Sequence, residues 1–186
     1  MKVFKKLAIS IFLAASLAVA PAAMAEPVIL IFDVDRAIGL SKAGKSMAEQ
    51  LEAQVSKVRA NETEILKGLQ GEAEKLREQQ KLMAPEALQQ KVEELRVKDV
   101  ERRRSVSEKT QSIQAGGQRA ASEIVKIAEE ELSAIAKERK ADIVMRRDAV
   151  FFASPAIDVT AELVSRLDKR LSKVVVKPVA LQTSGR

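Results

Sequence analysis

The stretch from Ala43 to Lys140 most constrains the fold. It is rich in Ala, Glu, Gln, Lys, Leu and Arg, lacks His, Cys and aromatic residues, and contains one proline, Pro85. This composition is typical of long helices, and a proline fits the first turn of a helix but not its interior. The sequence therefore predicts two long antiparallel helices joined at a tip near residues 83–86. At about 1.5 Å per residue the first helix would be on the order of 60 Å long, so the hairpin must project.

The N-terminal residues are typical of a secretory signal peptide. Three lysines among the first six residues precede an apolar run, 7–20, and Ala23-Met24-Ala25 is a small-x-small cleavage signal. We expect residues 1–25 to be removed, the mature chain to begin near Glu26, and the protein to be exported to a bacterial periplasm. Removing three of the 32 basic residues leaves 29 against 26 acidic ones, a net charge of +3, which indicates no particular partner. The absence of cysteine excludes disulfides.

The segments that flank the hairpin predict a small β-rich body, formed by residues 26–42 plus 141–172. An apolar run at 28–32 indicates a buried strand, and the helical period returns after Thr160. Further strands are expected at 143–145 and 149–153, paired as a hairpin, with a last short candidate at 174–176 in a tail, 173–186, that is otherwise predicted to be disordered.

The fold class is therefore α+β: a small β body and a long antiparallel coiled-coil hairpin. About fifty body residues without disulfides or metals are few for a stable core. We therefore predict that several copies share the body in a homo-oligomer.

Apolar residues along the hairpin form an incomplete heptad seam. The first arm has Glu62 where an apolar residue is due, and the return arm has Asp99, Arg102 and Lys109 at such positions. Gly116-Gly117 predicts a bend in the return arm. The sequence therefore favours a mobile arm over a rigid strut. The seam residues are Met47, Leu51, Val55, Val58, Ile65, Leu69, Leu76 and Leu82 on the first arm, and Leu88, Val92 and Leu95 on the return arm.

One motif suggests an enzyme. A strand followed by Asp33-Val34-Asp35 resembles the start of haloacid-dehalogenase phosphotransferases, but Ala37 stands where that motif needs a hydroxyl or β-branched residue. The repeating strand–helix units of that fold are missing as well. We therefore interpret both aspartates as the end of a strand and the start of a helix, where carboxylates complement the helix dipole. No nucleotide loop or metal-ligand cluster is evident, so we expect no enzyme activity and no cofactor.

Two segments carry a family resemblance. Val28 to Leu51, with Asp-Val-x-x-Ala-Ile-x-x-Ser-x-x-Gly-Lys after the strand, resembles the start of the Skp/OmpH family of periplasmic chaperones. Ala141 to Leu167 resembles the C-terminal body segment of that family. The resemblance implies a homotrimer with helical tentacles and an ATP-independent holdase that keeps unfolded outer-membrane proteins from aggregating.

Client contacts in such a protein would be diffuse. Each candidate residue could equally serve to join the two arms. The apolar candidates for client binding are Val55, Val58, Ile65, Leu69, Leu88, Val92 and Leu95. The family's lipopolysaccharide site is not carried over, because Ala115-Gly116-Gly117 at its counted position is not basic. Arg102, Arg103 and Arg104 are a substitute candidate for contact with anionic lipid or lipopolysaccharide.

Other functions are less consistent with the sequence. The main alternative is a structural periplasmic hairpin that acts as a tether or adaptor in an envelope complex. A tether needs a continuous seam, and the patchy seam with its glycine pair favours the chaperone. Nucleic-acid binding through the arginines conflicts with export and with the lack of aromatic stacking residues.

Overall fold

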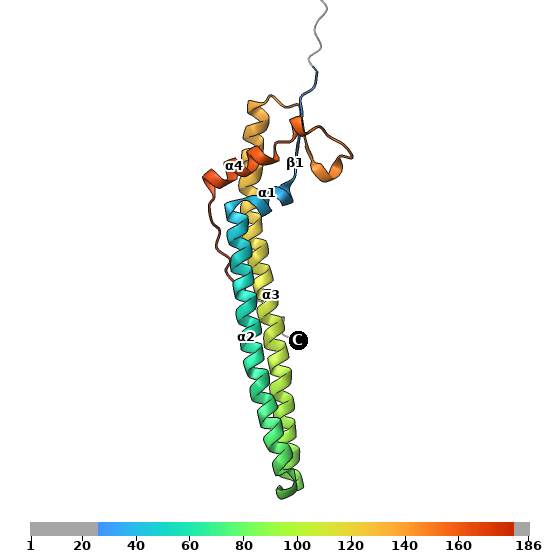
Figure 1. Ribbon diagram of the computed structural model, residues 1–186, viewed down its shortest axis with the longest axis vertical. Helices are drawn as coiled ribbons and strands as arrows, with labels where there is room; N and C mark the ends of the chain where they lie inside the picture. The colour runs from blue at the N-terminus through green and yellow to red at the C-terminus, as the bar shows by residue number, and fades with distance from the viewer. Residues whose placement is uncertain (1–25, 181–186) are drawn as a thin grey trace, which may run out of the picture.

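Two long helices dominate the structure, a computed structural model that describes residues 26–180. Helix α2 (Lys42–Gln79) and helix α3 (Pro85–Glu138) run antiparallel and project from a small body (Figure 1). A 3₁₀ turn, η1 (Gln80–Leu82), ends the first arm, and Pro85 occupies the first turn of α3. The predicted hairpin and tip are confirmed. The predicted signal peptide lies outside the described residues.

The body contains a two-stranded sheet, but not the predicted one. Strand β1 (Ile29–Phe32) pairs in parallel with strand β2 (Ile143–Arg146), so the whole hairpin is the connection between them. The other edge of β1 is taken by Asp158, which bridges Ile31, and by the N–H of Val159, which donates to the Ile31 carbonyl over 2.9 Å. This arrangement holds β1 in the middle of the body.

The predicted strand at 149–153 and its hairpin with 143–145 are wrong. Two short 3₁₀ turns, η2 (Arg147–Ala149) and η3 (Pro155–Ile157), border an irregular loop there. The reason is the parallel pairing: a chain leaving β2 must loop outward and return to reach the far edge of β1 (Figure 1).

Side chains cap the first two helices of the described chain. Asp33 is the N-cap of α1 (Val34–Leu40), and its carboxylate accepts from the N–H of Arg36 over 2.9 Å. The Ser41 hydroxyl accepts from the N–H of Gly44 over 3.0 Å and so caps α2. A Cβ at Gly44 would lie 1.8 Å from the Ile38 carbonyl oxygen, so this turn requires glycine. Asp33 thus acts in helix capping, as predicted.

The core lies where the base of the hairpin meets the body. Helix α4 (Thr160–Arg170) packs against α1 and α3, with Leu163 and Leu167 fully buried, and Ile124 and Ile135 of α3 belong to the same cluster. The base of α3 is therefore part of the body core. The expectation that about fifty residues must supply the core alone is wrong, since α3 contributes a large share.

Two predictions about the C-terminal third also need correction. Helix α3 runs unbroken through Gly116 and Gly117, which are buried, so they form no bend. Residues 174–176 form no strand, and the part of the tail up to residue 180 is packed rather than disordered, with Val174 and Val176 buried. The tail lies against the helix at Gly116, whereas Gly117 faces Leu51 of α2. Residues 181–186 lie outside the described residues.

Candidate functional site

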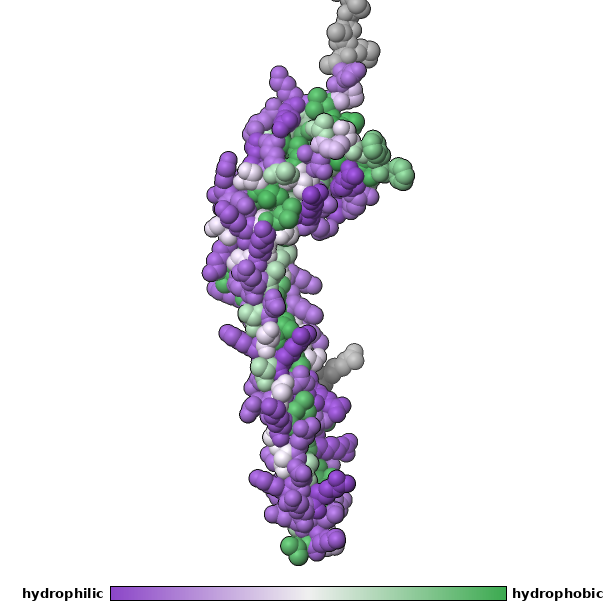
Figure 2. Space-filling view, in the orientation of Figure 1, coloured by the Kyte–Doolittle hydropathy of each residue, from purple (hydrophilic) through white to green (hydrophobic). Residues whose placement is uncertain are grey.

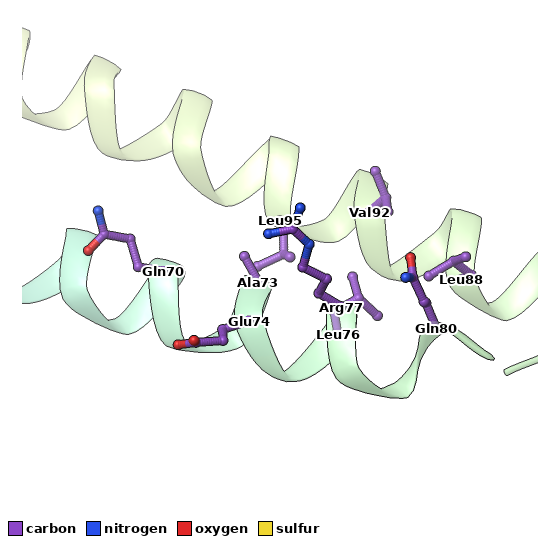
Figure 3. A pocket seen from close by; sticks show the side chains of 9 residues that line it. All are labelled: Gln70, Ala73, Glu74, Leu76, Arg77, Gln80, Leu88, Val92 and Leu95. Atoms are coloured by element: carbon purple, nitrogen blue, oxygen red, sulfur yellow. The ribbon is translucent and has the colours of Figure 1, made fainter. Parts of the chain in front are cut away.

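An apolar groove lies between the two helices near the tip of the hairpin. It has a volume of about 680 Å³, and its apolar walls come from Ala73 and Leu76 of α2 and from Leu88, Val92 and Leu95 of α3 (Figure 3). Its rim is polar and is formed by Gln70, Glu74, Arg77 and Gln80. Three of the predicted client-binding residues therefore line one open groove. Val92 keeps 52% of its surface exposed, so the groove is not closed by packing between the helices.

The four predicted client-binding residues of α2 are less well grouped. Val55, Val58 and Leu69 are half-buried between the arms, whereas Ile65 is 41% exposed. Leu66 is half-buried instead of Ile65, so the predicted seam is one position off there. Ile65 and Leu69 line a second, shallower groove of about 490 Å³.

Sequence reasoning missed exposed apolar residues outside the seam. Val97 and Val100 are 45% and 58% exposed, and Leu82 at the tip is 89% exposed. Val97 and Val100 are aliphatic residues outside the predicted heptad positions, so the sequence did carry a signal for both. Leu82 was assigned to the seam, but it is exposed at the tip instead. These residues extend the apolar surface of the arm into the scattered stripe visible along the hairpin in Figure 2.

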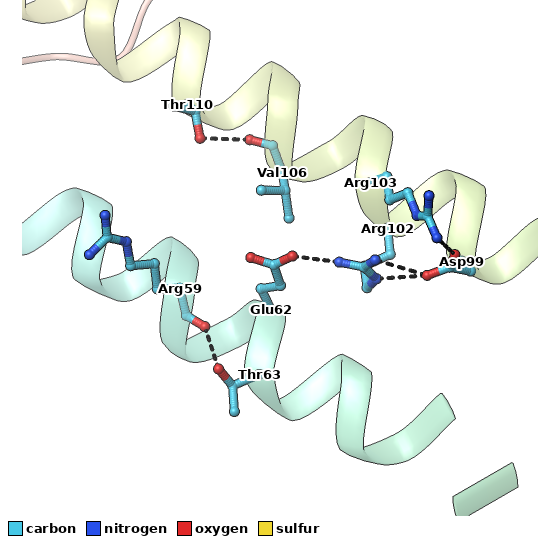
Figure 4. A network of polar contacts seen from close by, with 8 residues as sticks. All are labelled: Arg59, Glu62, Thr63, Asp99, Arg102, Arg103, Val106 and Thr110. Atoms are coloured by element: carbon cyan, nitrogen blue, oxygen red, sulfur yellow. Dashed lines mark hydrogen bonds and ion pairs between the residues drawn. The ribbon is translucent and has the colours of Figure 1, made fainter. Parts of the chain in front are cut away.

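The gaps in the seam are filled by an ion-pair network. Arg102, with a side chain 9% exposed, binds Glu62 of the opposite helix over 2.5 Å and Asp99 over 2.9 Å (Figure 4). Hydrogen bonds from Arg102 and Arg103 lower the pKa of Asp99, although partial burial opposes the shift. Three of the four polar residues that break the apolar stripe, Glu62, Asp99 and Arg102, therefore meet and join the arms at mid-length, whereas Lys109 is exposed.

This network bears on the predicted anionic-lipid contact. Arg103 pairs with Asp99 over 2.7 Å and Arg104 with Glu108 over 2.7 Å, with side chains 72% and 70% exposed. Both could still reach a headgroup, whereas Arg102 is enclosed between the helices. Lipid contact by the triplet stays a prediction, and the position of Arg102 does not favour its part in it.

The loop after β2 carries the most exposed aromatic residues of the described chain. Phe151 is fully exposed and Phe152 is 81% exposed. They lie in the loop that projects from the body beside the two-stranded sheet (Figures 1 and 2). The sequence predicted a strand here, because aromatic and β-branched residues favour strands. The structure instead places two large apolar side chains at the surface.

The described residues, 26–180, show little that suggests chemistry or membrane insertion. They contain no group of three or more His, Cys, Asp or Glu side chains placed to hold a metal ion. None of their helices combines the length and apolar character needed to cross a membrane. Asp33 caps a helix and Asp35 is exposed in its first turn.

A small α+β body that carries a long, polar helical hairpin with open apolar grooves defines a class of proteins with a projecting helical arm. Within that class, the chain belongs to the OmpH-like family, because the family described as "Outer membrane protein (OmpH-like)" matches residues 28–167. No curated protein sequence gives a significant match.

A solved structure agrees with the family match. It comes from Caulobacter crescentus CB15 and is described as OmpH-like and as a proposed outer membrane chaperone. It is 27% identical to this chain, with a TM-score of 0.80, and the match covers 86% of this chain and 95% of that one. The long hairpin and the small body are thus the architecture of this family.

Proposed function

We propose that the protein is an ATP-independent periplasmic holdase that binds unfolded outer-membrane proteins and prevents their aggregation on the way to the outer membrane. The observation that carries this proposal is the open groove at the outer end of the hairpin, where Leu88, Val92 and Leu95 remain accessible. The family match and the likeness to the OmpH-like structure from Caulobacter support it.

The geometry suits many weak contacts. Burying apolar surface stabilises a complex by roughly 25 cal/mol per Å², so one half-exposed valine such as Val92 contributes at most about 1 kcal/mol. Shallow grooves spread along the arm can therefore hold a chain without fixing its conformation. A client held this weakly can leave when its own folding into the membrane is more favourable, and no energy source is needed.

We also propose that the body assembles as a homotrimer. Phe151 and Phe152 are exposed, and β2 pairs on one edge only within the described chain. Exposed aromatic residues and an open strand edge are surfaces that another copy can cover. Three copies would place three hairpins around one space, in which a client could contact several grooves at once.

A tether or adaptor is the alternative that still has to be tested. The glycine pair no longer argues against a tether, because α3 is continuous through Gly116 and Gly117. What still disfavours it is the outer arm, where apolar residues lie open along the sides rather than gathered at a docking tip. A tether would be expected to leave unfolded chains unprotected.

The deciding experiment is light scattering of a urea-diluted outer-membrane β-barrel protein mixed with the mature protein, without ATP. The particle mass is determined alongside. We expect suppressed aggregation from a particle about three times the monomer mass. Suppression should weaken in the double variant Leu88→Lys/Val92→Lys and stay unchanged in the matched control Gln89→Lys/Gln90→Lys, which adds the same charge at exposed polar positions. A trimer that leaves aggregation unchanged would favour the tether.

A further inference from the structure

The last described segment, residues 173–180, lies extended against the base of the hairpin. Its side chains alternate as in a strand: Val174 and Val176 are 2% and 4% exposed, while Val175 between them is 59% exposed. The segment first contacts α2 and then α3, so it crosses from one helix to the other (Figure 1). The described chain therefore already contains one extended peptide bound in a groove.

The groove holds this segment chiefly through its backbone. Gln50 forms a two-way contact: its Nε2 donates to the Val174 carbonyl over 2.7 Å, and its Oε1 accepts from the Val176 N–H over 3.1 Å. Gln54, one turn further along α2, donates through Nε2 to the Val176 carbonyl over 2.9 Å. Contacts to main-chain atoms are available to any extended polypeptide, as in recognition by strand addition.

Helix α3 supplies the other side of the groove. The Ser112 hydroxyl donates to the Val179 carbonyl over 2.6 Å, and the Val179 N–H donates to the Ser112 carbonyl over 3.0 Å. Between these contacts, a Cβ at Gly116 would lie 2.3 Å from the Lys177 carbonyl oxygen. The glycine thus lets a peptide backbone approach the helix backbone closely.

One polar atom of the groove has no partner among the described residues. Gln54 Oε1 is buried and accepts no hydrogen bond. In the pattern that Gln50 sets, the donor for this atom would be the N–H of residue 178, two positions after the carbonyl that Gln54 contacts. Residue 178 is proline and has no N–H. The protein's own tail therefore leaves one hydrogen bond of the glutamine pair unmade, and a buried unpaired acceptor is unfavourable.

We infer that this groove, formed by Gln50, Gln54, Ser112 and the surface at Gly116, is a binding site for an extended polypeptide segment with alternating apolar residues. Residues 173–180 occupy it as an internal ligand that such a segment replaces. The inference rests on the proposed function and locates one place where a client chain is held. Alternating apolar residues are the pattern of membrane β-strands, which have an N–H at almost every position.

The tail competes because it is tethered, at an effective concentration in the millimolar range. A client already held by other parts of the arm has a comparable advantage, and its N–H can satisfy Gln54. The groove would then stay covered in the free protein and open when a client is present. Proline at position 178 makes the tail a weaker ligand than a segment with an N–H there.

The test uses the full mature chain and a fluorescein-labelled octapeptide, Lys-Val-Val-Val-Lys-Ala-Val-Ala, which is residues 173–180 with alanine for proline. Val174→Asp/Val176→Asp should expel the tail and leave the groove intact. Val175→Asp, on the exposed side, is the matched control. We expect fluorescence anisotropy to show peptide binding at least about tenfold tighter for the double variant than for the wild type or the control. Adding Gln50→Ala and Gln54→Ala should remove that gain.

A double variant that keeps its helical circular dichroism but does not bind the peptide would overturn the inference. If the double variant loses its helicity, the test uses the single variant Pro178→Ala in the full chain instead. The new N–H should bind Gln54 and slow amide exchange at Val179 and Ala180 by roughly two- to tenfold. Unchanged exchange would overturn the inference.

The wild-type aggregation assay separates this inference from the proposed function. If the wild type suppresses aggregation but the double variant does not bind the peptide, the groove is not a peptide-binding site and the holdase proposal still stands. If the double variant binds the peptide but the wild type does not suppress aggregation, the groove binds peptides and the holdase proposal is wrong.

Discussion

The inner and outer halves of the hairpin differ sharply although the same two helices form both. In the inner half, Ile113, Ala120 and Ile124 of α3 are buried under the body and the tail. In the outer half, from Val55 to the tip and back to Gln111, no residue of this described stretch is fully buried. One half is thus a protein core and the other is a pair of helices in contact with solvent. The comparison separates the part that supplies stability from the part that offers binding surface.

The largest expected effect comes from a cavity in the inner half. Ile124 is fully buried among α3, α4 and the tail, so Ile124→Ala should reduce the free energy of unfolding by about 2–5 kcal/mol. Leu76→Ala is the matched change in the outer half and should cost only about 1 kcal/mol, since its side chain is half-exposed. Urea denaturation followed by circular dichroism measures both. Equal losses would mean that the two halves form one core.

The mid-hairpin ion pair tests how the outer half is held. Arg102→Leu leaves Glu62 without its partner between the helices and Asp99 with Arg103 alone, and it should cost about 1–3 kcal/mol. Glu62→Leu/Arg102→Leu should recover most of that loss, because an apolar pair can replace a buried ion pair. The double-mutant cycle is measured by thermal denaturation. Additive losses would show that the two side chains do not interact.

A smaller effect concerns the carboxylates that join α3 to α4. Arg166 binds Glu138 and Glu162 over 2.6 Å each, and these hydrogen bonds lower the pKa of both carboxyl groups, against a smaller opposing effect of desolvation. Because the pKa of these carboxyl groups is lower in the folded protein, their ion pairs stabilise the fold fully at pH values above the ordinary glutamate pKa near 4.5. This stabilisation is lost as the pH falls through the lower pKa of the folded state. The melting temperature should therefore fall over that acidic range.

Arg166→Gln isolates the effect of that arginine. It removes the ion-pair partner of Glu138 and one of the two arginines that pair with Glu162, the other being Arg139. The variant should therefore show a lower melting temperature at neutral pH and a shallower loss in acid. Arg104→Gln is the control, since Arg104 pairs with Glu108 in the exposed outer half. The same pH dependence in wild type and Arg166→Gln would show that these pairs do not stabilise the inner half.

The two halves also differ in how far the sequence predicted them. The break at Pro85, the long helices and the helix start at Asp33 depend on neighbouring residues, and the sequence predicted them. The parallel pairing of β1 with β2 was not, because it joins residues more than a hundred positions apart. The burial of Gly116 depends on the tail, so the local rule that a glycine pair softens a helix gave the wrong result.

The candidate site shows the same division. Leu88, Val92 and Leu95 were predictable as an apolar face, and they do line one groove. The sequence did not predict that Leu66 rather than Ile65 is half-buried, because that depends on how the two helices are rotated against each other. The exposure of Phe151 and Phe152 was missed because it depends on which edge of β1 the chain returns to.

The smallest expected effect concerns the outer surface itself. Val100 is 58% exposed, so Val100→Ser should change the free energy of unfolding by no more than about 0.5 kcal/mol. If the outer half offers many interchangeable contacts, the same variant should also reduce suppression of client aggregation only slightly, and Val92→Ser/Val97→Ser/Val100→Ser should reduce it in proportion to the apolar area removed. A single replacement that abolished suppression while stability stayed unchanged would mean that the arm has one defined site, and the outer half would then resemble the inner half more closely than its exposure suggests.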